Sequence, residues 1–127
     1  MNPDDTNSAA PSIQCISTVT MAVHDLGRSL RFYRALGFAL HYGDEQGPMI
    51  SFKVGAGYLN LIAAPAEQHW SWWGRVIFYV ADVDAFHARA VALGLRPLTP
   101  PQDAPWGERF FHLTDPDGHE LSFAKPL

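Results

Sequence analysis

The first half of the chain shows a strand, a helix and three further strands in its pattern of apolar and polar residues. Residues 16–23 alternate apolar side chains with small or polar ones, as in a half-buried strand. Apolar residues then recur every three or four positions, which predicts one buried face of a helix. These positions are Leu26, Leu30, Tyr33 and Leu36. Three short apolar runs separated by glycine-containing turns predict strands at 38–42, 49–54 and 58–63.

Two residues are expected to set the ends of this helix. Asp25 precedes it, and its carboxylate can accept hydrogen bonds from the free N–H groups of the first turn. Gly37 follows it, at the position where helices commonly end in a left-handed conformation.

The same order of elements begins again near residue 75. We expect strands at 75–80, 95–99, 108–114 and 119–124, with a loop over 100–107. The second helix is expected to begin after Asp82, with apolar positions at Val83, Phe86 and Ala90. The last two strands are joined by Asp115-Pro116-Asp117-Gly118, whose residue types suit a type I turn and predict a hairpin.

The two halves also share residues. A shift of 57 positions places Val19 on Val76, Asp25 on Asp82, and the tripeptide at 35–37 on that at 92–94. We therefore predict an α+β fold of two tandem βαβββ modules, at about 13–64 and 74–125, forming a curled mixed sheet in a single domain. Residues 1–12 are expected to be a disordered N-terminal tail. A ferredoxin-like sandwich is the alternative, but the extra hairpin in each half disfavours it.

Composition narrows the classes of function. Of the 127 residues, 47% are hydrophobic and 17% are charged, which predicts a folded domain with a core. No apolar run reaches the roughly 20 residues of a membrane span, and no basic stripe occurs at a net charge of −4, so neither a membrane nor nucleic acid is expected as partner. Cys15 is the single cysteine and the first twelve residues lack a signal-peptide pattern, which predicts a cytoplasmic protein.

Two motifs accompany the duplicated order, D-L-G-R-S-L-R-F-Y-R-A-L-G-F at 25–38 and D-P-D-G-H-E-L-S-F at 115–123. With the repeat, they resemble the glyoxalase / bleomycin resistance protein / extradiol dioxygenase superfamily, also called the vicinal oxygen chelate (VOC) fold, over residues 13–124. Isomerases, dioxygenases, transferases and non-catalytic drug-binding proteins share this fold, so the resemblance specifies the fold more closely than the reaction.

The resemblance also implies where a metal would bind. Metal-dependent members place His, Gln or Glu ligands on the first and last strands of each half, facing a concave cavity. The matching positions here are Thr18, Asn60, Arg75 and Ser122. The first, second and fourth are weak neutral donors, and an arginine cannot coordinate a cation and repels it. We therefore expect no metal ligands and no cofactor, and a divalent metal only under the alternative below.

These considerations predict a member of the superfamily that binds a flat, partly apolar small molecule in the concave cavity, with Arg75 holding an anionic or carbonyl oxygen. The alternative is a metal-dependent VOC enzyme with non-standard ligands such as His112 and Glu120. It would be a lactoylglutathione lyase-like enzyme, an isomerase or a ring-cleaving dioxygenase. A third hypothesis is an interaction module without ligand chemistry. No catalytic residue is identified, and whether turnover occurs stays open.

Strand parity and aromatic content add further cavity candidates, because side chains two apart on a strand share a face. The expected ligand-binding set is Thr18, Asn60, Arg75, Tyr79, Trp106, Phe111, His112, Glu120 and Ser122. Arg75 alternatively pairs with a surface acid such as Glu108. Three tryptophans in the segment between the halves, at 70, 72 and 73, have three open interpretations: a pocket wall, a dimer interface or a cap on the core. The resemblance predicts a homodimer.

Overall fold

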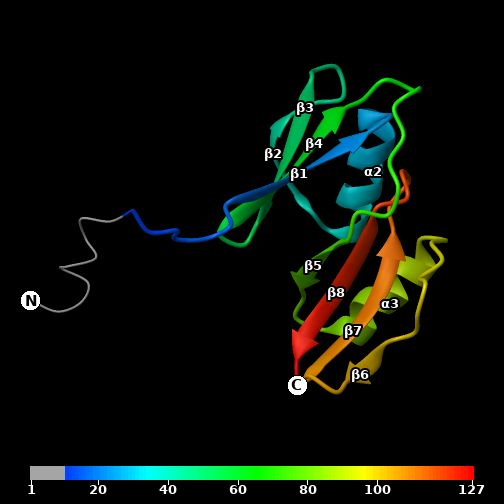
Figure 1. Cartoon of the computed structure of the whole chain (residues 1–127). Coiled ribbons are helices and arrows are strands. Elements are labelled where there is room, and N and C mark those ends of the chain that lie inside the picture. Colours follow the sequence, from blue (N-terminus) through cyan, green and yellow to red (C-terminus); the bar gives the residue numbers. More distant parts are fainter. Residues whose placement is uncertain (1–10) are drawn as a thin grey trace, which may run out of the picture.

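The fold consists of two four-stranded sheets, each with a helix on one face (Figure 1). The computed structural model describes residues 11–127, so most of the expected tail, residues 1–10, lies outside the described residues. The first module contains β1 (Thr18–Val23), α2 (Leu26–Leu36), β2 (Ala39–Gly43), β3 (Met49–Val54) and β4 (Gly57–Ala63). The second module contains β5 (Arg75–Tyr79), α3 (Val83–Ala92), β6 (Gln102–Ala104), β7 (Glu108–Thr114) and β8 (Glu120–Pro126).

The two modules have the same topology. The strand orders are β1-β4-β3-β2 and β5-β8-β7-β6. In each sheet the first strand runs parallel to the last, and the other neighbours are antiparallel. The predicted α+β fold of two βαβββ modules is thereby confirmed.

The predicted strand at 95–99 is wrong. Residues 102–104, which were expected in a loop, form β6 beside β7 instead. Pro97 lies inside the predicted strand, and proline has no N–H group to contribute to a ladder. Leu98 N still donates to His112 O over 2.8 Å, so this segment follows β7 through an isolated hydrogen bond.

Both helices begin where the sequence predicted. The Asp25 side chain accepts from Arg28 N, and the Asp82 side chain accepts from Ala85 N, as N-cap residues do. Gly37 ends α2 with a φ of 106°, a left-handed conformation that favours glycine.

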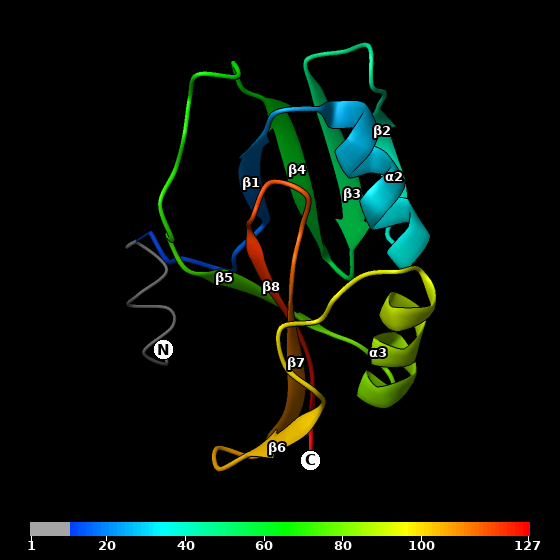
Figure 2. The ribbon, with the colours of Figure 1, turned by 90° about the vertical axis from the view of Figure 1, so that its right-hand side faces the viewer.

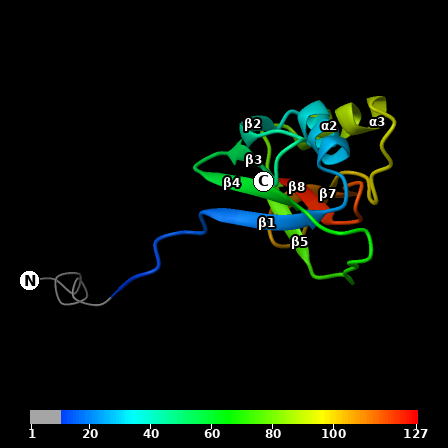
Figure 3. The same ribbon diagram turned by 90° about the horizontal axis from the view of Figure 1, so that it is seen from above.

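The core lies between the helices and the sheets and runs through both modules. The ring of Phe38, just after α2, packs edge-on against Phe78 of β5 with centroids 5.0 Å apart. Figure 3 shows both helices on one side of the sheets. The opposite face of the two sheets, which we call the open face, carries no helix of the described chain.

The turn between β7 and β8 fastens the second module to the first. Asp117 Oδ1 accepts from His24 N over 2.9 Å and from Arg28 Nη2 over 3.1 Å, and its Oδ2 accepts from Ser29 Oγ over 3.3 Å. The Asp117 side chain is fully buried by these contacts. The start of α2 is thus capped partly by a residue of the other module.

Asp115 makes a second connection from the same turn. Its Oδ2 accepts from Tyr33 Oη of α2 over 2.8 Å, and its Oδ1 accepts from the backbone N–H groups of Asp117 and His119. Burial raises the pKa of Asp115, although these hydrogen bonds favour its ionised form. Burial and the neighbouring carboxylate raise the pKa of Tyr33 well above its usual value. Both aspartates of the motif at 115–123 therefore act in joining the modules.

Residues 64–74, which we call the linker, connect the modules and pass beside β1 (Figure 2). Among the described residues, no helix is long and apolar enough to cross a membrane.

Candidate functional site

The open face of the second sheet brings together most of the predicted site residues. Strand register places Arg75 beside Glu120, and Ile77 and His112 on either side of Ser122. Neighbouring residues on these strands point to the opposite face, where the core lies. This register places Glu120 and Ser122 on one face, as strand parity predicted, and adds Ile77 and His112 to that face.

Arg75 lies on β5, at the position that the family resemblance assigns to a metal ligand, and its charge is compensated by a neighbouring acid. Its Nε lies 2.5 Å from Glu120 Oε2, and its guanidinium carbon lies 5.7 Å from the centre of the Trp72 ring. The partner acid is Glu120 rather than Glu108, the example named from the sequence. The pair leaves the terminal Nη groups of Arg75 as the donors that a ligand could use.

Further along the open face, Glu108 accepts hydrogen bonds from two aromatic side chains. Its carboxylate accepts from Tyr79 Oη, and from Trp106 Nε1 over 3.0 Å. The Trp106 ring stacks on Phe110 with centroids 5.9 Å apart. The hydrogen bond to Glu108 raises the pKa of Tyr79. Tyr79 is 65% and Trp106 69% exposed, so both rings offer free apolar surface.

His112 lies half-buried on β7 with its Nδ1 buried and without a hydrogen-bond partner. Burial, followed by the nearby Arg75 charge, lowers the pKa of His112, while Glu120 opposes this shift. The imidazole is therefore neutral near pH 7 and can exchange a hydrogen bond with a bound molecule.

The open face of the first sheet carries the other two family positions. Thr18 and Asn60 line a shallow cavity of about 270 Å³ together with His41, Ser51 and Tyr58. Asn60 Oδ1 is buried without a partner. Among the described residues, Asn60 Oδ1 and His112 Nδ1 are the two buried side-chain polar atoms in this condition, and both belong to the open face. Buried polar atoms are normally hydrogen-bonded, so both invite a partner from outside the chain.

Two predicted residues are less available than expected. Ser122 lies on the open face but is 3% exposed, so it contributes at the floor of the site. Phe111 does not belong to the open face. It is fully buried on the helix side and packs against Phe123 and Phe86, because adjacent residues of β7 point to opposite faces and His112 takes the open one.

The family's metal positions do not suit a metal ion here. Arg75 places a guanidinium where a ligand would stand, and Thr18, Asn60 and Ser122 supply neutral oxygens. His112 and Glu120 lie close enough to influence each other, yet residues 11–127 contain no group of three His, Cys, Asp or Glu side chains that could hold a metal.

The linker tryptophans divide into anchors and exposed rings. Trp70 stacks between His24 and His119, with centroids 4.8 Å and 5.0 Å away, and its Nε1 donates to Asp117 O. Trp73 Nε1 donates to His119 Nδ1 over 2.8 Å. Trp72, in contrast, is 68% exposed above Arg75.

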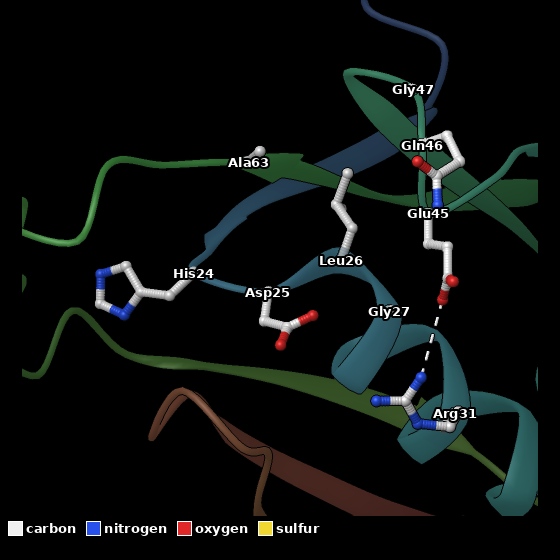
Figure 4. Close-up of a pocket in the computed structure, with 9 residues that line it drawn as sticks. All are labelled: His24, Asp25, Leu26, Gly27, Arg31, Glu45, Gln46, Gly47 and Ala63. Carbon is white, nitrogen blue, oxygen red and sulfur yellow. Dashed lines mark ion pairs between the residues drawn. The ribbon is translucent and has the colours of Figure 1, made fainter.

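Another cavity, of about 480 Å³, lies at the start of α2 (Figure 4). Figure 4 shows the Arg31–Glu45 ion pair across one side of it, with Asp25 and His24 on the other. Asp25 accepts from the helix backbone and Arg31 pairs with Glu45, so these charged groups of the wall already have partners.

Sequence reasoning missed the residues that complete the site. The sequence suggested Glu108 only as a partner for Arg75, and it did not predict His41, Ser51 or Tyr58 as ligand-binding residues. The alternation of β3 and β4 could have placed Ser51 and Tyr58 on the face of Asn60. The bulge in β2 beside His41 could not be read from alternation.

The chain matches the family model described as Glyoxalase/Bleomycin resistance protein/Dioxygenase superfamily over residues 16–123, and therefore belongs to this superfamily. A glyoxalase/bleomycin resistance protein/dioxygenase from Nocardioides is 21% identical, with a TM-score of 0.74 over 98% of this chain and 91% of that one. A lactoylglutathione lyase from Agrobacterium tumefaciens is 24% identical, with a TM-score of 0.72 over 89% and 94%. At these identities the likeness shows the fold alone.

TioX from Micromonospora sp. ML1 is 27% identical, with a TM-score of 0.72 over 90% of this chain and all of that one. Among curated proteins, the uncharacterized protein Mb0911c of Mycobacterium bovis is 40% identical over 48 residues. That match covers 38% of this chain and 32% of the relative, so the chain spans about a third of the relative's length.

Proposed function

We propose that this protein binds a flat, partly apolar small molecule on the open face without using a metal at the family's ligand positions. The observation that carries the proposal is the pair of buried, unpartnered polar atoms, Asn60 Oδ1 and His112 Nδ1. An unpaired buried polar group costs about 1–3 kcal/mol, and a ligand that bonds to it recovers that cost.

The charges of the open face favour a neutral oxygen on the ligand. Glu120 compensates Arg75, so a second anion beside Arg75 would meet Glu120 as well. A carbonyl oxygen can accept from the free Nη groups without that repulsion. The exposed rings of Trp72 and Trp106 suit the apolar plane of such a molecule.

A homodimer would complete the site. The open face exposes Ile77 at 56% and Tyr42 at 65%, beside the half-buried polar groups. Exposed apolar patches of this kind mark binding surfaces, and a second copy would enclose a ligand more fully than one shallow face does. Sedimentation velocity tests this directly: a dimer is expected, and a monomer at all concentrations would contradict it.

Two measurements test the binding proposal. Elemental analysis of protein purified without chelators is expected to find no stoichiometric divalent metal. Tryptophan fluorescence is then titrated with flavone, a flat neutral carbonyl compound, and saturable quenching is expected. Arg75→Ala should weaken binding by about 10-fold or more, as for the loss of a charged hydrogen-bond donor.

Arg109→Ala is the matched control, because Arg109 also forms ion pairs, with Asp84 and Asp103, on the other face of the second sheet. It should bind flavone as the unmodified protein does. Equal weakening in both variants, or a divalent ion whose removal abolishes binding, would contradict the proposal.

A further inference from the structure

A second cavity lies apart from the family positions, between the outer edge of β1 and the linker. Its volume is about 340 Å³, within the range of small-ligand sites, and it is lined by Thr20 and Ala22 of β1, Gln68, Trp73 and His119, among others. Figure 2 shows the linker passing along this side of β1.

The edge of β1 facing this cavity has free backbone groups. Within the described chain, β1 has β4 as its single strand neighbour. Ser17 O and Val23 O accept from β4 and the residue after it, so the odd-numbered residues of β1 direct their backbone groups toward β4. The backbone groups of Thr20 and Ala22 therefore point the other way, toward the linker.

The far end of this edge is closed by the second module. His119 Nε2 lies 2.7 Å from Ala22 O, and His24 N donates to Asp117 Oδ1. Because the Trp73 indole N–H can only donate, His119 Nδ1 accepts from it. His119 Nε2 therefore carries the hydrogen and donates to Ala22 O. Within residues 11–127, three backbone groups beside the cavity are left without a partner: the Thr20 N–H, the Thr20 carbonyl and the Ala22 N–H. The binding mode proposed below uses the last two.

We propose that this edge groove binds an extended amide backbone, as found in a peptide or a peptide-like small molecule. One carbonyl and one N–H, separated along β1 by Met21, match the N–H and carbonyl of a single residue in an added parallel strand. Trp70 has an imidazole on each side, so Trp73, 46% exposed, supplies the free ring face for an apolar side group. This inference does not depend on the proposed open-face ligand.

The test uses the full chain and two capped tripeptides, acetyl-Val-Phe-Val-amide and its analogue N-methylated at Phe. In ¹⁵N–¹H NMR titrations, the first peptide should shift the amide signals of Ala22 and Trp73. Methylation removes the donor that the Thr20 carbonyl requires, and should weaken binding by about 10-fold.

A matched pair of variants removes the other hydrogen bond. Ala22→Pro deletes the N–H that faces the groove and leaves the β1–β4 ladder intact, as proline is tolerated on strand edges. Ala22→Pro should also lower the affinity for the unmethylated peptide by about 10-fold. Ala22→Gly keeps the N–H, so its affinity for this peptide should stay within about 2-fold of that of the unmodified protein. Arg75→Ala should leave peptide binding unchanged, which separates this result from any failure at the open face.

Three outcomes would overturn the inference. The first is absence of shifts at Ala22 and Trp73 up to the solubility limit of the unmethylated peptide, a measurement that needs no variant. The second is equal binding of both peptides, which would indicate apolar contact alone. The third is conversion of a dimer to a monomer by Ala22→Pro in sedimentation velocity, which would assign this edge to a subunit contact.

Discussion

The β7–β8 turn and the open face both carry several polar side chains, and they differ in how those side chains are satisfied. In the turn, Asp115 and Asp117 accept from the backbone and from α2 with every carboxylate oxygen. On the open face, Asn60 and His112 each keep a buried atom without a partner. A satisfied cluster stabilises the fold, and an unsatisfied one indicates that something else completes it.

The largest effect is expected from Asp115→Ala. The change leaves Tyr33 Oη and two backbone N–H groups without their acceptor in a buried position, and should lower the free energy of unfolding by about 3 kcal/mol. Urea denaturation measures this. Asp44→Ala is the control, because Asp44 also accepts two backbone N–H groups, but in an exposed turn where water replaces it. Equal losses of unfolding free energy in the two variants would show that the buried contacts of Asp115 stabilise the fold no more than the exposed contacts of Asp44 do.

The linker tryptophans give an intermediate effect. Trp70→Ala removes a ring stacked between two imidazoles and should destabilise the fold by about 2 kcal/mol. Trp72→Ala should lower the free energy of unfolding by less than about 0.5 kcal/mol, since its ring is mostly exposed. The same variant should weaken flavone binding. Thermal denaturation of both variants measures these losses. A larger loss of stability for Trp72→Ala than for Trp70→Ala would show that Trp72 serves mainly to stabilise the fold.

The smallest effect concerns pH. The pKa of His112 is lowered from 6.5, so the unfolded chain takes up this proton at higher pH than the folded protein does. The corresponding stability is present above pH 6.5 and is lost as pH falls through the folded pKa. Unfolding measured from about pH 7.5 to 5.5 should therefore show a smaller pH dependence in His112→Gln. NMR titration of His112 with a midpoint at or above 6.5 would contradict this.

The sequence predicted the local features well because their causes are local. Asp25 and Gly37 bound α2 through contacts within one turn of the helix. Residues 102–104 escaped prediction because two prolines precede a three-residue strand whose pairing with β7 depends on the tertiary fold.

The candidate site follows the same rule. Strand parity placed Glu120 on the face of Ser122, and Tyr79 on the face of Arg75. The ion pair between Arg75 and Glu120, however, forms because β5 lies beside β8, and the sequence does not show this pairing. The assignment of Phe111 failed because it was taken together with His112, its neighbour on the same strand, and alternation allows one of the two on a given face. The stacking of Trp70 on His24 and His119 joins segments that no local pattern connects.

The connection made by Asp117 has a consequence for how the chain is built. Asp117 caps residues 93 and 88 positions earlier, and Asp115 reaches Tyr33 across 82 positions. During synthesis on the ribosome, these contacts with the first module cannot form until residues 115–117 have been made. Contacts of such long sequence separation slow folding. Because these contacts join the two similar modules, we expect the modules to unfold together rather than one at a time.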